Sequence, residues 1–134
     1  MLAINRILLV ALAALTVLAA SPATAPAQEY LGADLQPTEA EPLASGWAEW
    51  TLDWDIRWHP IIILDVQVQD IYSTSTVQVL IHRPGTESCA LVGVIYLTDG
   101  SGHLTRRNWY VIPGDQILIV DESTGTLLLW GIFE

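Results

Sequence analysis

Residues Trp50 to His59 form the clearest pattern of side chains that could bind a ligand. Apolar and polar residues alternate strictly through this run. Successive side chains of an extended strand point to opposite faces, so the pattern predicts a half-buried β-strand. One face would then carry a row of three indoles, Trp50, Trp54 and Trp58. Exposed indoles bind sugar rings and protein partners, whereas buried indoles fill a core, and the pattern leaves both roles open.

The opposite face of the same run carries Asp53, Asp55 and Arg57. Two neighbouring carboxylates could serve acid–base hydrolysis, which requires a concave, partly dry site that raises one pKa. Adjacent positions on an exposed strand beside an arginine provide the opposite environment, in which both carboxylates stay solvated and ionised. We therefore expect this face to be a solvated surface and not a catalytic site.

A second set of catalytic residue types, Asp99, Ser101 and His103, surrounds Gly100 and Gly102. A hydrolytic triad needs a base that is oriented by an independent third group, and neighbours within one tight turn point apart. The segment also lacks the strand-to-helix turn that makes a nucleophilic serine reactive. The sequence therefore predicts a turn here and a protein that is not an enzyme.

Four acidic residues in three separate breaks could form a metal site: Asp70, Asp99, Asp121 and Glu122. In an up-and-down path of antiparallel strands, alternate loops share one end, so these side chains could converge on a hard cation such as Ca²⁺. Acids are also common in turns because Asp accepts local backbone hydrogen bonds, and Greek-key crossings would separate the loops. We expect no cofactor, with Ca²⁺ at these four residues as the alternative.

The elements that would position these residues are short apolar runs separated by Gly, Pro, Asp and Ser, which suit turns. Strands are expected at about 50–58, 61–69, 77–83, 89–98, 103–112, 116–121 and 126–133. Their spacing predicts an all-β fold: a single antiparallel β-sandwich of about seven strands, immunoglobulin-like, with a small closed barrel as the alternative. Trp47, Trp109 and Trp130 are expected to be single anchors in its core.

The first 27 residues have the organisation of a secretory signal peptide. A short start with Arg6 precedes an apolar stretch from Ile7 to Ala20, which is too short for a comfortable membrane span. We expect cleavage after Ala27, with a retained N-terminal anchor as the alternative. The sequence then divides into a signal peptide (1–27), an extended lead segment (28–46) and a β-sandwich domain (47–134). It predicts a secreted or cell-surface protein, extracellular or periplasmic, with no membrane span after cleavage.

The chain is strongly acidic, with a formal net charge of −10, and it contains no lysine. A surface of this charge repels phosphate backbones, so we expect no nucleic-acid partner. The single cysteine, Cys89, cannot form an internal disulfide. The fold must therefore depend on packing.

Three runs, Ile61–Leu64, Ala90–Leu97 and Leu127–Phe133, are apolar at nearly every position. One face of an antiparallel sheet usually meets water, so this surplus of apolar surface indicates contact with a protein partner or self-association. We expect a secreted, non-enzymatic β-sandwich that acts as an extracellular binding, adhesion or surface-assembly module. The alternative is a carbohydrate-binding module that holds a glycan on the strand-borne row of tryptophans.

Overall fold

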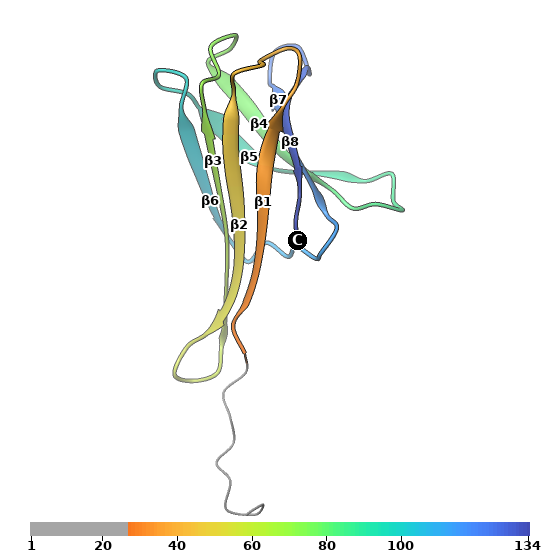
Figure 1. The fold of residues 1–134 in the computed structure, drawn as a ribbon. Helices are drawn as coiled ribbons and strands as arrows, with labels where there is room; N and C mark the ends of the chain where they lie inside the picture. Colours follow the sequence, from red (N-terminus) through yellow and green to blue (C-terminus); the bar gives the residue numbers. More distant parts are fainter. Residues whose placement is uncertain (1–26) are drawn as a thin grey trace, which may run out of the picture.

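The described part of the chain folds as eight β-strands joined by loops, and it contains no helix (Figure 1). The computed structural model describes residues 27–134. The strands are β1 (Glu29–Pro37), β2 (Ser45–Trp54), β3 (Pro60–Gln69), β4 (Thr76–His82), β5 (Cys89–Tyr96), β6 (Gly102–Arg107), β7 (Gln116–Asp121) and β8 (Leu127–Ile132). These residues include no helix long and apolar enough to cross a membrane. The predicted signal peptide lies, except for Ala27, outside the described residues.

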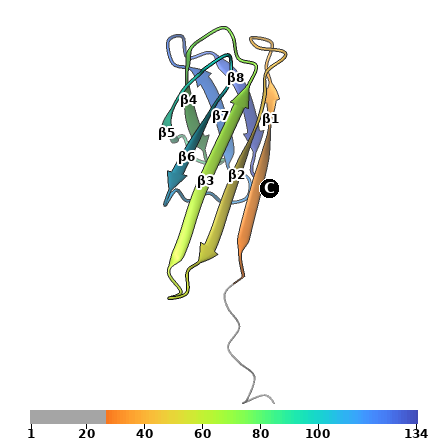
Figure 2. The same ribbon diagram turned by 90° about the vertical axis from the view of Figure 1, so that its left-hand side faces the viewer.

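All eight strands belong to one antiparallel sheet, in the order β5-β4-β7-β8-β1-β2-β3-β6. Strands β6, β3, β2 and β1 form one half of the sheet, which faces the other half across the core (Figure 2). The halves are joined where β1 pairs with β8. The two outermost strands also meet, since Arg106 Nε in β6 donates a 3.2 Å hydrogen bond to the Val92 carbonyl oxygen in β5. The sheet is thus nearly closed and barrel-like.

The predicted all-β fold is confirmed, whereas the immunoglobulin-like sandwich of about seven strands is not. The additional strand, β1, comes from the segment 28–46, which we expected to precede the domain as a lead segment. That expectation is wrong, because Ala33 and Leu35 are buried in the core and β1 pairs with β2 on one side and β8 on the other. The small side chain of Ala33 made the alternation inconspicuous, and Pro37 and Pro42 suggested a loop. Pro37 is the last residue of β1, and Pro42 lies in the turn that follows.

Alternation in the central strands builds the core. In β3, every second residue from Ile62 to Val68 is buried, and β4 shows the same pattern. Each fully buried aliphatic side chain of this kind stabilises the fold by about 1.5–3 kcal/mol. Trp50 of β2 is also buried, and its Nε1 atom donates a 2.7 Å hydrogen bond to the carbonyl oxygen of Trp109. Trp109 belongs to the segment 108–115, which links β6 to β7.

The surplus of apolar residues forms a row on the outer face of the sheet. Leu91, Leu80, Leu118 and Trp130 are successive cross-strand neighbours in β5, β4, β7 and β8. The two residues at the ends of this row are exposed, and the two between them are half-buried. The continuous apolar runs therefore place one set of side chains in the core and another on the surface. The surface row ends at Trp130, beside β1.

Candidate functional site

The predicted row of three indoles does not form one surface. Strand β2 ends at Trp54, so the prediction that it continues to Trp58 is wrong. Trp50 lies in the core. Trp54 is half-buried, with its Nε1 atom buried and without a hydrogen-bond partner, and Trp58 lies in the turn beyond the strand. The three side chains therefore have three different environments.

Asp55 is the residue that turns the chain. Its Oδ1 atom accepts 2.8 Å hydrogen bonds from the backbone N–H groups of Arg57 and His59, a local pattern typical of Asp in turns. The turn places Trp58 at a φ of 63°, a conformation that bulky residues rarely adopt. Strands β1, β2 and β3 project past the other strands, so the turn between β2 and β3 lies at the end of an arm (Figure 1). Residues 55–59 are called the hairpin tip below.

The predicted turn around Asp99 and Gly100 is present. Backbone hydrogen bonds of 2.8 and 3.1 Å between Thr98 and Ser101 close it. His103 lies on the following strand, β6. The three residue types of a hydrolytic triad thus follow one another along a turn and the start of a strand.

The three loops that carry the predicted metal ligands do lie together. Backbone hydrogen bonds of 3.0 and 3.2 Å join the segment 70–76 to the turn that follows Asp99 and to Glu122. The acidic side chains have local partners, however: Asp70 accepts a hydrogen bond from the Tyr72 hydroxyl, and Asp121 accepts two from Ser123. Across residues 27–134, no group of three or more His, Cys, Asp or Glu side chains could hold a metal ion.

Glu41 and Asp115 are buried acids that act as hydrogen-bond acceptors for loops. Glu41 Oε1 accepts hydrogen bonds from the backbone N–H groups of Tyr72 (3.2 Å) and Ser73 (2.6 Å). The Ser73 hydroxyl and these N–H groups outweigh the effect of burial and lower the pKa of Glu41. Burial raises the pKa of Asp115, but the hydrogen-bonded Arg83 guanidinium and a backbone N–H group outweigh it, so this pKa is also lowered. A general acid needs a raised pKa, which neither carboxylate has.

Acid should therefore destabilise the fold. A group whose pKa is lower in the folded state contributes stability above its unfolded pKa and loses that contribution as the pH falls through its folded pKa. From the ordinary values of 4.5 for Glu41 and 3.8 for Asp115, the loss should begin near pH 4.5 and continue below pH 3.8. Thermal unfolding followed by circular dichroism over a pH series measures it, and Glu41→Gln should make the decline shallower. An unfolding temperature that stays constant through this range would contradict the prediction.

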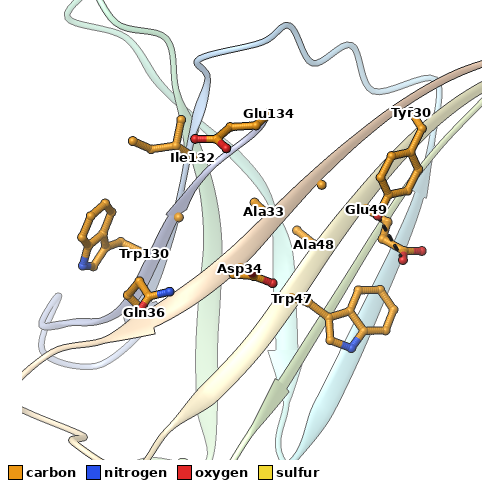
Figure 3. Close-up of a pocket in the computed structure, with 12 residues that line it drawn as sticks. Tyr30, Ala33, Asp34, Gln36, Trp47, Ala48, Glu49, Trp130, Ile132 and Glu134 are labelled. Carbon is orange, nitrogen blue, oxygen red and sulfur yellow. Dashed lines mark hydrogen bonds between the residues drawn. The ribbon is translucent and has the colours of Figure 1, made fainter.

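A groove of about 750 Å³ crosses the outer face of the barrel over β1, β2 and β8 (Figure 3). Its aromatic side chains are Tyr30, Trp47 and Trp130. Its polar side chains are Asp34, Gln36, Glu49 and Glu134. Figure 3 shows the two indoles on opposite sides of Asp34 and Gln36. The groove therefore combines flat apolar faces with hydrogen-bonding groups between them.

The strand register assembles this groove. Asp34 of β1 pairs with Trp47 of β2, and Gln36 of β1 pairs with Trp130 of β8. Alternation turns all four side chains to the outer face. The backbones of β1 and β8 cross closely at Gly131, where a Cβ atom would come within 2.7 Å of the Asp34 carbonyl oxygen. Glycine at this position lets the two halves of the sheet meet, which brings the two indoles to one groove.

The groove is acidic. Asp34, Glu49 and Glu134 supply carboxylates, and none of its twelve lining residues is Lys, Arg or His. The Tyr30 hydroxyl donates a 3.4 Å hydrogen bond to Glu49 Oε1. Partial burial and the Glu49 charge raise the pKa of Tyr30, so the phenol keeps its proton at neutral pH. Aromatic faces beside carboxylate acceptors and the Gln36 amide suit a sugar ring, which has apolar C–H faces and a rim of hydroxyls.

Both indoles of the groove, those of Trp47 and Trp130, were expected in the core, and that expectation is wrong. Trp47 is 37% exposed and Trp130 is 39% exposed. For Trp47 the sequence contained a usable signal, because the alternation that sends Trp50 inward sends position 47 outward. For Trp130 the sequence contained no such signal, because the run from 127 to 133 has apolar residues at odd and even positions alike and so does not show which of them face the core. Only the pairing of β8 with its neighbours decides which face that indole occupies.

Two smaller hollows, of about 340 and 410 Å³, lie against the segment 108–115. One contains the ion pair between Arg83 and Asp115, which holds this segment in place. The larger groove over β1, β2 and β8 is therefore the candidate site. No protein-family model, curated protein or solved structure matches the chain, so its function is inferred from this geometry.

Proposed function

We propose that this protein is an exported, non-enzymatic binding module that holds a saccharide chain in the groove over β1, β2 and β8. The observation that carries the proposal is the pair of exposed indoles, Trp47 and Trp130, on either side of Asp34 and Gln36 (Figure 3). Aromatic side chains offer large, rigid contact area at low entropic cost. The ligand class is the one that the sequence predicts as an alternative, but the proposed site uses different tryptophans.

Export and the lack of catalysis are part of the same proposal. The signal-peptide pattern of residues 1–27 supports a secreted or cell-surface location, outside the cytoplasm, where a saccharide polymer would be met. The lowered pKa values of the buried acids Glu41 and Asp115 support structural roles for both carboxylates. The groove itself presents hydrogen-bonding groups without an activated nucleophile, which suits reversible binding.

Titration with neutral hexasaccharides tests the proposal. Cellohexaose, xylohexaose and the hexamer of N-acetylglucosamine are added to the purified protein while tryptophan fluorescence and sedimentation are recorded. We expect a saturable change in fluorescence with at least one of them, because the ligand covers two indoles, and an unchanged sedimentation coefficient. The proposal would be contradicted if neither these three nor charged hexasaccharides caused a saturable change at millimolar concentration.

Self-association through the hairpin tip is a second candidate function. Ile56 is 97% exposed and Trp58 is 50% exposed, at the end of a projecting arm. The positive φ of Trp58 is a strained conformation that the hydrogen bonds of Asp55 hold in place. Exposed apolar side chains on an ordered arm suit an interface with a second copy, as an adhesion or surface-assembly module requires.

Replacing Ile56 by Ser and Trp58 by Asn together should reduce the average sedimenting mass to that of the monomer. Asn adopts positive φ more readily than other residues with side chains, so the turn should be retained. Analytical ultracentrifugation over a concentration series measures the effect. Tyr96→Ser, which changes an exposed aromatic residue on β5, is the control. A wild-type protein that is monomeric throughout, or a double variant that still associates, would remove this candidate and leave the saccharide proposal untouched.

A further inference from the structure

We infer that the groove selects a saccharide that carries amino groups, such as an oligomer of a 2-amino-2-deoxy sugar, over neutral and acidic saccharides. The inference rests on the proposed function, because it names the chemical class of ligand for the same groove. The charges of the groove, their lack of cationic partners and the neighbouring indoles support it.

Within residues 27–134, no ion pair neutralises a carboxylate of the groove. The two ion pairs found among the described residues both lie outside the groove. Glu49 has a hydrogen bond from the Tyr30 hydroxyl, which carries no charge at neutral pH. No side-chain hydrogen bond to Asp34 or Glu134 is found within residues 27–134. A positively charged ligand would supply the missing partner, and a carboxylated ligand would be repelled.

The three carboxylates are distributed along the groove and not gathered at one point. Gly32 of β1 pairs with Glu49 of β2 on one side and exchanges backbone hydrogen bonds of 3.1 and 3.0 Å with Glu134 on the other. Asp34 lies two residues further along β1, at a distance of about 7 Å for a strand that rises by roughly 3.4 Å per residue. Separate negative charges suit a chain with repeated amino groups better than a single ammonium group.

The indoles add a second reason for cation selectivity. The face of a tryptophan ring attracts an ammonium group through the ring quadrupole. A protonated amino sugar that stacks on Trp47 or Trp130 gains this attraction together with the attraction of the nearby Asp34 carboxylate. A neutral sugar in the same position gains the stacking and its hydroxyl hydrogen bonds, without either charge interaction.

Hexasaccharides that differ in charge test the inference. The hexamer of glucosamine, the hexamer of N-acetylglucosamine and the hexamer of galacturonic acid are titrated into the purified protein by calorimetry. The titrations are carried out at a mildly acidic pH, at which the amino groups of the glucosamine hexamer and the carboxylates of the groove are both charged. We expect the glucosamine hexamer to bind about tenfold more tightly than its N-acetylated counterpart at low salt, and added salt to reduce the difference. The galacturonic acid hexamer should show no binding.

A charge-removing variant tests whether the groove is the origin of the preference. Asp34→Asn combined with Glu49→Gln should weaken binding of the glucosamine hexamer about tenfold. Binding of the N-acetylated hexamer should weaken much less, because Asn and Gln still form hydrogen bonds with hydroxyls. Glu122→Gln, an exposed carboxylate outside the groove, is the matched control and should keep the preference.

The possible results separate the inference from the proposed function. Equal affinity of the wild-type protein for the glucosamine and N-acetylglucosamine hexamers would overturn the inference and leave saccharide binding intact. A preference that Glu122→Gln removes as fully as the groove variant would reflect the overall charge of the protein and would also overturn it. A failure of all three hexamers and of the other neutral saccharides to bind would overturn the proposed function itself.

Discussion

The double variant Trp47→Ala, Trp130→Ala should lose at least about 100-fold in affinity for the saccharide that binds the wild-type protein best. Truncating an aromatic anchor at the centre of a binding site typically costs about 2 kcal/mol or more, and 1.4 kcal/mol corresponds to about tenfold in affinity. The two indoles come from different strands and lie on opposite sides of the groove, so their effects should be nearly additive. Isothermal titration calorimetry of both single variants and the double variant measures this.

The fold should survive these substitutions, because both side chains lie on the outer face of the sheet. Near-ultraviolet circular dichroism and the urea midpoint check that it does. Trp58→Asn removes an exposed indole outside the groove and should leave saccharide affinity unchanged. A folded double variant that binds within about threefold of the wild-type protein would place the ligand elsewhere on the surface.

Asp115→Ala should lower the free energy of unfolding by about 3 kcal/mol. The side chain of Asp115 is fully buried and accepts hydrogen bonds of 3.0 Å from Arg83 Nε, Arg83 Nη2 and the Ile112 N–H group. Its backbone carbonyl also accepts a hydrogen bond from the N–H group of Phe133, after β8. The alanine variant leaves the part-buried Ile112 N–H group without its acceptor and a cavity in place of the buried carboxylate, whereas the half-exposed Arg83 can be solvated.

Urea unfolding followed by tryptophan fluorescence measures the effect, with the slope of the transition expected to stay constant. Asp115→Asn keeps the size of the side chain and an acceptor for Ile112, so it should lose less stability than the alanine variant. Asp53→Ala, which removes an exposed carboxylate whose hydrogen bond is to the adjacent Trp54 N–H group, is the surface control and should change little. An Asp115→Ala variant as stable as that control would show that the ion pair does not hold the segment 108–115.

The strands that could be located from the sequence are those with turn residues on both sides. The expected strands at 61–69, 77–83 and 116–121 correspond closely to β3, β4 and β7. The expected strand at 103–112 ends early, as β6, at Arg107. Asn108 has a φ of 60°, and the chain then leaves the sheet so that the Trp109 carbonyl can accept the hydrogen bond of Trp50. That partner is distant in the sequence, so no local pattern marks the end of the strand.

The candidate site was harder to predict from the sequence than the strands were. The sequence pattern favoured a site made of Trp50, Trp54 and Trp58, which are near one another in the chain. Strand β2 ends before Trp58, because the Asp55 carboxylate accepts backbone hydrogen bonds that turn the chain. The tryptophans that do share a surface, Trp47 and Trp130, belong to strands from opposite ends of the domain. Between them lies β1, the strand that the composition of its segment concealed.

The all-β class, the acidic charge and the location of most strands follow from the amino-acid sequence alone. These properties are local or additive, because the alternation of an extended chain and the sum of its charges need no knowledge of distant contacts. Which aromatic side chains face a common groove depends on how distant strands pair in the folded protein. The pairing of β1 with β8 creates that groove through long-range backbone hydrogen bonds and the close crossing at Gly131, and neither depends on residues that are neighbours in the chain.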